Sequence, residues 1–302
     1  MSQVLLERLG GLWVGEGVSH GAVTIFPLTG GRQGKLNYSL LDEAVGNGGL
    51  EVRELESASV GQLLAVNKGS LPVLLLDGEE LVGGKQNRTV NSSVLVPSGQ
   101  TVLPVSCVEQ GRWHNLTPTF SSSEASYPSL RAARTRQVRD SLRARGVHES
   151  DQGGVWASVQ ARQVAASVAS HTGAMAHIYS ERRDTLQAYE RALPYRDGAI
   201  GLIAAVGGKI TSMDVFDSPL VMEKLWAKLI RACAVDALSL PPGNPVEKER
   251  AVRMLNRARY AKFEWFRTPG LGEDVRVSGN GVVGAALLHD GVVVHSALFR
   301  QH

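Results

Sequence analysis

One stretch, residues 74–113, constrains the fold of this chain more than any other. It begins with an apolar run that ends at Asp77, and it contains two further β-rich runs at residues 94–96 and 102–108. Short apolar runs bounded by turn residues are typical of buried strands. Ionisable and amide side chains fill the space between the first two runs. The stretch therefore predicts either a polar pocket floored by strands or a simple surface loop between them.

The polar side chains of this stretch are the candidate site residues. Glu79 and Glu80 are adjacent, so only one of them can point into a pocket if they lie on a strand. Glu109 supplies a second carboxylate, and the catalytic residues expected of an enzyme are Glu80 and Glu109, either of which would act as the general base. The expected ligand-binding side chains are Lys85, Gln86, Asn87, Arg88, Asn91, Arg112 and Trp113.

A glycine-rich segment, residues 78–85, is similar to a phosphate-binding loop but departs from its pattern. An extra glycine separates Gly83 from Lys85, and Gln86 stands where the motif requires a hydroxyl residue. Backbone N–H groups in the glycine turns, together with Lys85 and Arg88, would still form an anion nest. A solvated hairpin tip is the alternative, and the residues by themselves leave both open.

Three segments of the chain resemble a known family. They read LLLDGEELVGGKQNRTVNSSVLVPSGQTVLPVSCVEQGRW from residue 74, ITSMDVFDSPLVMEKLWAKLIRACAVDAL from residue 210, and VVVHSALF from residue 292. With the sequence between them, from about Leu64 onward, they resemble the ARG-and-rhodanese-phosphatase-superfamily-associated protein domain family. The resemblance implies a link to ADP-ribose metabolism, but it brings no set of catalytic residues with it.

This resemblance, combined with the residue types, leads to two hypotheses of different classes. In the first, the chain binds an ADP-ribose-type or NAD-derived nucleotide. Lys85 and Arg88 then hold the diphosphate, the amide side chains contact ribose or base, and Trp113 stacks on a ring. As an enzyme, it would hydrolyse a glycosidic or phosphate linkage. In the second, the chain is a non-catalytic assembly or scaffold protein that forms homo-oligomers without a small-molecule ligand.

The composition is typical of a cytoplasmic protein. The chain has 302 residues, a net charge of +3 and two cysteines, Cys107 and Cys233. So few cysteines argue against a disulfide framework and favour a reducing compartment. The N-terminus lacks the apolar region of a signal peptide, and no run approaches the roughly 20 apolar residues of a membrane helix. We therefore expect a small nucleotide-like partner and no membrane partner, and the sequence indicates no particular cofactor.

The order of strand and helix patterns predicts an α+β fold in three parts. Residues 1–120 predict a β-rich domain, either a sandwich or a small barrel, which carries the polar site. Residues 121–195 predict a helical middle segment, and residues 196–302 predict an antiparallel sheet with two helices that packs with the first part. Residues 116–128 are rich in Ser, Thr and Pro and indicate a linker or an extended surface segment.

The middle segment contains an arginine-rich helix, expected at residues 130–145. Val138 and Leu142 are its clear apolar pair, and six arginines cover the remainder. We interpret them as a solvated face, since surface helices commonly carry such charge. A lid that reaches a phosphate is the second interpretation. No aromatic residues lie among the arginines, so we expect no nucleic-acid partner.

Cys107 and His295 are further candidates with simpler explanations. Cys107 shares a strand face with Glu109, and a small buried apolar residue explains it better than a nucleophile does. His295 lies inside an apolar run, where a lone histidine is usually a satisfied core residue. Histidines with the paired spacing of a zinc site are lacking, so no metal site is expected.

Overall fold

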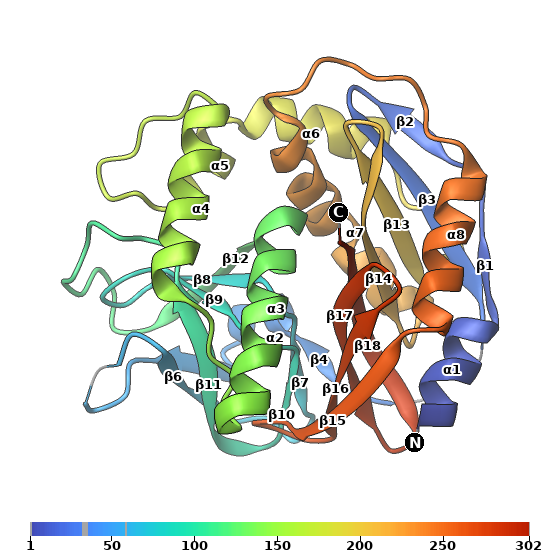
Figure 1. Cartoon of the computed structure of the whole chain (residues 1–302). Helices are drawn as coiled ribbons and strands as arrows, with labels where there is room; N and C mark the ends of the chain where they lie inside the picture. Colours follow the sequence, from blue (N-terminus) through green and yellow to red (C-terminus); the bar gives the residue numbers. More distant parts are fainter. Residues whose placement is uncertain (1, 32–35, 58, 302) are drawn as a thin grey trace.

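The computed structural model describes residues 2–31, 36–57 and 59–301, and it confirms the predicted α+β fold class. The strands form a closed barrel, a large antiparallel sheet and a three-stranded sheet. The barrel and the large sheet lie side by side, with helix α3 (Pro128–Arg145) in front (Figure 1). The predicted barrel in the first part and the predicted antiparallel sheet with helices in the last part are both present.

The barrel is built from strands of the first 125 residues. Its apolar interior includes Leu63, Leu81, Leu103 and Phe120, and helix α2 (Leu41–Gly46) packs beside it. In sheet order its strands are β11 (Gly99–Cys107), β6 (Gln62–Asn67), β5 (Leu50–Arg53), β12 (Phe120–Ala125), β8 (Glu79–Gly83) and β9 (Arg88–Val90). Pairing between the first and the last strand of this order closes the ring, so the barrel presents no open edge.

Strand β12 corrects the expectation that residues 116–128 form a linker. It pairs antiparallel with β8 and, through Phe120 and Val52, with β5. The strand lacks the alternating apolar residues that mark a half-buried strand in a sequence, since four of its six residues are SSSE. Its backbone hydrogen bonds to two neighbours hold it in place instead, and the pairing is irregular between Ser122 and Ala125.

The large sheet combines strands from both ends of the chain. Strand β3 (Val23–Gly30) pairs with β13 (Gly201–Val206), so pairing crosses the predicted division at residue 120. The three-part division itself stays a prediction. The other strands, in sheet order, are β1 (Leu12–Val14), which precedes β3, and after β13 come β14 (Lys209–Phe216), β18 (Val292–Arg300), β17 (Val282–His289), β16 (Glu273–Gly279) and β15 (Lys262–Arg267), while β2 (Val18–His20) pairs with β3.

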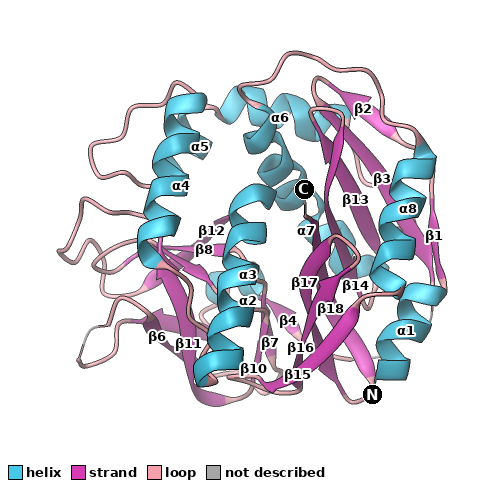
Figure 2. Ribbon diagram, viewed as in Figure 1, coloured by secondary structure: helices cyan, strands magenta, loops and turns pink. Residues whose placement is uncertain are grey.

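Both faces of the large sheet are covered by helices, as the alternation along its strands requires (Figure 2). On β13, Leu202 and Ala204 face one core while Ile203 and Ala205 face the other. Helices α3 and α7 (Pro219–Ala237) contact the first face, and α1 (Ser2–Gly10) and α8 (Lys248–Arg259) contact the second. The remaining elements are α4 (Gln152–Ala165), α5 (Ala176–Glu181), α6 (Arg183–Ala192) and the sheet of β10 (Val94–Val96), β7 (Val73–Leu75) and β4 (Ser39–Leu40).

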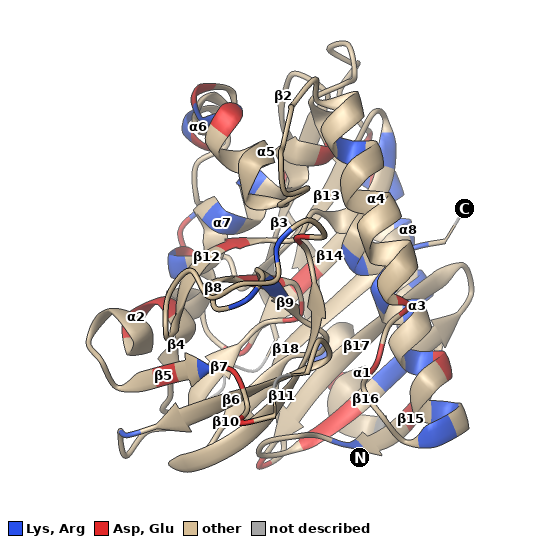
Figure 3. Cartoon of the chain, turned by 90° about the vertical axis from the view of Figure 1, so that its left-hand side faces the viewer, with Lys and Arg blue, Asp and Glu red and all other residues tan. Residues whose placement is uncertain are grey.

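Two arginines of α3 correct the interpretation of that helix as a solvated face. Arg131 and Arg134 are buried to within 2% of full burial, although Arg136, Arg143 and Arg145 are exposed. Arg131 is paired with Asp214 of β14 at 2.7 Å, and Arg134 with Asp77 at 2.6 Å. Charged segments appear on α3 and on the strands that lie behind it (Figure 3). The helix therefore joins the barrel to the large sheet through buried ion pairs.

Candidate functional site

Most of the predicted site residues gather at one end of the barrel. Strands β9 and β11 pair with Arg88 opposite Cys107, so the segment before Arg88 and the segment after Cys107 leave the barrel at the same end. We call this group the barrel-end network. It consists of Lys85, Gln86, Asn87, Arg88, Glu109, Arg112 and Trp113.

Arg112 and Glu109 form the centre of the barrel-end network. The Arg112 guanidinium donates hydrogen bonds to Glu109 Oε2 at 2.5 Å, to Asn87 Oδ1 at 3.1 Å and to the Gly84 carbonyl at 2.6 Å. Burial acts to raise the pKa of Glu109, but the bonds from Arg112 and from the Asn87 N–H outweigh it, so the pKa lies below its usual value. Glu109 is therefore an ionised carboxylate whose Oε2 is already engaged.

The glycine turn beside this network does not offer an open anion nest. Its successive N–H groups are hydrogen-bonded to side chains: Gly83 to Asn87 Oδ1, Gly84 to Thr117 Oγ1 and Lys85 to Glu54 Oε1. The oxygen atoms of the protein itself thus occupy the positions that a phosphate would take in such a nest. The solvated hairpin tip does not describe this segment either, because Gly83, Gln86 and Asn87 are buried.

The two cations of the network differ in access. Arg88 is fully buried, and burial lowers its pKa despite the nearby Cys107 and Glu54. Trp113 is 51% exposed, and the ammonium of Lys85 lies 5.2 Å from the centre of its ring. Of the two cations predicted to hold a diphosphate, only Lys85 reaches the surface, as part of a cation–π pair with Trp113.

Asn91 is not part of this network. Its amide donates to the carbonyl of His148 at 2.9 Å, and its Oδ1 accepts from the hydroxyl of Ser106 at 2.6 Å. The side chain ties the barrel to the segment between α3 and α4. The roles predicted for the seven binding residues and for Glu109 stay predictions.

Of the two adjacent glutamates, Glu79 is held in an internal ion pair and Glu80 is not. Glu79 Oε1 accepts from the ammonium of Lys228 at 2.9 Å, and its Oε2 accepts from the Leu76 N–H. Glu80 is completely buried, and neither of its carboxyl oxygens has a hydrogen-bond partner among the described residues. Desolvation by burial, with repulsion from Glu124 and Glu109, raises the pKa of Glu80 to about 8, which the Ala176 backbone N–H partly offsets.

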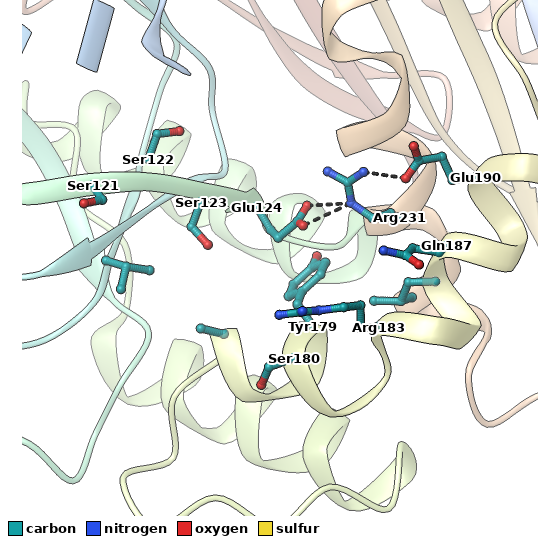
Figure 4. A pocket seen from close by; sticks show the side chains of 13 residues that line it. Ser121, Ser122, Ser123, Glu124, Tyr179, Ser180, Arg183, Gln187, Glu190 and Arg231 are labelled. Atoms are coloured by element: carbon teal, nitrogen blue, oxygen red, sulfur yellow. Dashed lines mark hydrogen bonds and ion pairs between the residues drawn. The ribbon is translucent and has the colours of Figure 1, made fainter. Parts of the chain in front are cut away.

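Glu80 lies directly behind a pocket of about 500 Å³ that its neighbours line. Glu124, whose charge acts on Glu80, and Ala176, whose N–H approaches it, both line this pocket. Val82, two residues along β8 and therefore on the same strand face as Glu80, lines it too. None of the predicted site residues is in the lining itself. The walls come from β8, β12 and helices α5, α6 and α7 (Figure 4).

The charged groups of the pocket are partly paired with one another. Arg231 of α7 donates to both oxygens of Glu124 at 3.0 Å and to Glu190 at 2.6 Å (Figure 4). Arg183 of α6 lies beside Tyr179 in the same view, and it has no hydrogen-bond or ion-pair partner among the described residues. The pocket therefore contains one basic side chain that is available to an anion.

The neutral polar groups of the pocket are hydroxyls and an amide. Ser121, Ser122 and Ser123 line it from β12, and Gln187 lines it from α6 (Figure 4). Burial, together with the charges of Glu124 and Glu80, raises the pKa of Tyr179 well above its usual value. The Tyr179 phenol therefore stays protonated, and it donates to the Ala125 carbonyl.

The pocket-lining residues are functional candidates that the sequence did not indicate. They come from five elements separated by as much as half of the chain, and no motif joins them. The one signal was the SSSE run of residues 121–124, which carries an acidic group among hydroxyls. Its low apolar content led to the linker interpretation instead.

Metal and membrane sites were sought among the same described residues. Within them, no three His, Cys, Asp or Glu side chains gather closely enough to hold a metal ion. Across residues 2–31, 36–57 and 59–301, no helix combines the length and the apolar character needed to cross a membrane. His295 and Cys107 are both buried, and His295 is satisfied by Ser93 at 2.7 Å and Asp214 at 3.2 Å.

Comparison with known proteins identifies one family. Residues 11–299 match the family described as the ARG and Rhodanese-Phosphatase-superfamily-associated Protein domain. The match spans nearly the whole chain, so the chain belongs to this family, as the resemblance in its sequence indicates. No curated protein and no solved structure matches it.

Proposed function

We propose that this member of the ARG and Rhodanese-Phosphatase-superfamily-associated Protein domain family binds an ADP-ribose-type or NAD-derived nucleotide in the pocket between β12 and helices α5–α7. One observation carries the proposal: a fully buried, unpartnered carboxyl group, Glu80, lies behind a polar pocket. Buried polar groups without partners are rare and mark sites that a ligand completes. A volume of about 500 Å³ falls within the range of small-molecule sites.

The lining of the pocket suits the parts of such a ligand. Arg183, which has no partner in the described chain, would pair with the diphosphate through charge-assisted hydrogen bonds. The hydroxyls of Ser121–Ser123 and the amide of Gln187 would exchange hydrogen bonds with ribose hydroxyls. The acidic pair Glu124 and Glu190 is neutralised in part by Arg231, so it does not repel the anion strongly.

Titration calorimetry with ADP-ribose and with NAD tests the binding. Arg183→Ala removes the available cation, and we expect it to weaken binding about ten- to hundredfold, the effect of losing a hydrogen bond to a charged group. Arg191→Ala is the matched control, because Arg191 is an exposed arginine on the same helix that does not line the pocket. We expect its affinity to equal that of the wild type.

The same titration separates this pocket from the barrel end. If Lys85→Ala or Trp113→Ala abolishes binding while Arg183→Ala leaves it unchanged, the nucleotide binds at the barrel-end network and the pocket assignment is wrong. If neither nucleotide releases heat with the wild type and the protein forms concentration-dependent oligomers, the assembly hypothesis replaces the binding hypothesis.

Hydrolysis of a glycosidic linkage is a second candidate function, and the protonated state of Glu80 favours it. A carboxyl with a pKa of about 8 retains its proton at neutral pH, so Glu80 suits the role of general acid rather than the general base expected from the sequence. The glycosidic C–O bond would break as Glu80 gives its proton to the departing oxygen. A water molecule would bond to the anomeric carbon and give its proton to Glu124.

Product analysis with the Glu80→Gln variant tests this chemistry. Glutamine keeps the shape of the side chain but has no acidic proton to transfer. We expect the variant to bind ADP-ribose with the affinity of the wild type and to release no ribose product. Wild-type protein that binds and releases nothing would remove the enzymatic hypothesis and leave the binding hypothesis in place.

A further inference from the structure

A basic groove lies along α8, on the face of the large sheet opposite α7. Its hollow of about 280 Å³ is lined by five basic side chains, which we call the α8 groove: Lys209, Arg250, Arg253, Arg257 and Arg300. A second hollow of about 500 Å³ shares Arg253 and Arg257 with it and adds Asn256, Tyr260 and Asn280. The two hollows therefore form one continuous surface, at the outer edge of the molecule where α8 lies (Figure 1).

No carboxylate lines either hollow, and none of the five basic side chains forms an ion pair within the described residues. Other exposed cations of the protein are paired: Lys248, on the same helix, pairs with Glu16, and Arg143 pairs with Glu264. A solvated surface helix usually carries charges of both signs in alternation. An uncompensated set of this size around a hollow indicates a site for an anion.

Three of the arginines are held in place by backbone carbonyls rather than by acids. Arg250 donates to the Gly208 carbonyl at 2.7 Å, Arg257 donates to the Asn280 carbonyl at 2.8 Å, and Arg300 donates to the Gly281 carbonyl. These carbonyls belong to two tight turns, in which Gly208, Asn280 and Gly281 have positive φ angles. The guanidinium groups are thus oriented before any ligand binds, and their remaining N–H groups and full charges are available.

We propose that the α8 groove binds the phosphate chain of a nucleoside di- or triphosphate, with the base stacked on Tyr260. Tyr260 is 80% exposed at the far end of the second hollow, beside the amides of Asn256 and Asn280. A phosphate chain between Lys209, Arg300 and Arg253 would place the nucleoside along α8 toward that ring. This site is separate from the pocket behind Glu80, and neither proposal depends on the other.

Equilibrium binding of pyrophosphate, AMP and ADP to the full chain tests the proposal. The titrations use the wild type and Arg183→Ala in parallel, so that any binding in the pocket behind Glu80 is removed in the second. We expect ADP to bind more tightly than pyrophosphate or AMP and to bind less tightly as salt concentration rises. We expect Arg253→Ala to weaken ADP and pyrophosphate about tenfold or more. Tyr260→Ala should weaken ADP about tenfold and leave pyrophosphate unchanged.

Control variants and competitors make the outcome decisive. Arg253 has no partner in the described chain, so its replacement is not expected to affect folding, and Arg136→Ala removes an exposed arginine on α3 as the matched control. Absence of ADP binding in the Arg183→Ala protein, or an unchanged affinity in Arg253→Ala, would overturn the site. A single-stranded oligonucleotide that binds the groove more tightly than ADP would overturn the assignment to a mononucleotide. Equal effects of Tyr260→Ala on ADP and pyrophosphate would overturn the stacking role.

Discussion

Replacement of Glu80 by glutamine is expected to change how the stability of the protein depends on pH. Glu80 is completely buried, and desolvation raises its pKa from 4.5 to about 8. Below pH 4.5 the carboxyl is protonated in both the folded and the unfolded chain, so it makes stability neither rise nor fall with pH. Between these values the unfolded chain loses the proton while the folded chain keeps it. The free energy of unfolding therefore falls as pH rises, by up to about 1.4 kcal/mol per pH unit.

The size of the effect follows from the two pKa values. From pH 4.5 to about pH 7, Glu80 lowers the free energy of unfolding by about 3 kcal/mol, and by about 5 kcal/mol once pH exceeds 8. A glutamine side chain does not titrate, so the Glu80→Gln variant lacks this loss. The difference in unfolding free energy between variant and wild type should therefore increase by about 3 kcal/mol from pH 4.5 to neutral pH. A constant cost of burying the amide cancels in this comparison.

Urea unfolding of both proteins at several pH values measures this difference. Glu181→Gln is the control, because Glu181 is an exposed glutamate on α5 that does not line the pocket, and its replacement should change stability by less than about 0.5 kcal/mol at every pH. Parallel curves for Glu80→Gln and wild type would refute the reasoning. Glu80 would then ionise as an ordinary carboxyl and would not be the proton donor that the pocket requires.

Three further substitutions test the fold. Arg131→Ala leaves Asp214 without its main partner in a buried pair, so we expect a loss of about 3–5 kcal/mol in urea unfolding, and a loss below about 1 kcal/mol would contradict the role of that pair. Phe120→Ala opens a cavity in the barrel and should also cost about 3–5 kcal/mol, whereas residues in a linker would tolerate it with no change. Gly84→Ala requires a positive φ of 49° and places a methyl group 2.2 Å from the Phe120 ring, so a melting temperature equal to that of the wild type would show that the turn is built differently.

Much of the fold could be predicted because its strands carry local signals. The apolar alternation of β5 and the turns at Asn280-Gly281 and Asp290-Gly291 set the ends and faces of their strands without reference to the remainder of the chain. The pairing of β3 with β13 could not be predicted in this way, because it joins residues that are far apart in sequence. The burial of Arg131 likewise depends on Asp214, which lies in a different element.

The candidate site divides along the same line. The polar stretch after residue 76 contains Glu80, the carboxyl that the structure leaves without a partner behind the pocket. Which of the two adjacent glutamates would be free depended on Lys228 of α7, since this lysine pairs with Glu79. The pocket itself was beyond sequence reasoning, because Ser121, Tyr179, Arg183 and Arg231 meet only through the packing of β12 against three helices.

A crystal structure of the protein with ADP-ribose bound tests the central claim most directly. The account predicts the nucleotide in the pocket between β12 and helices α5–α7, with its diphosphate on Arg183 and the carboxyl of Glu80 behind it. A nucleotide bound against Lys85 and Trp113 at the barrel end, with the pocket occupied by water alone, would contradict it.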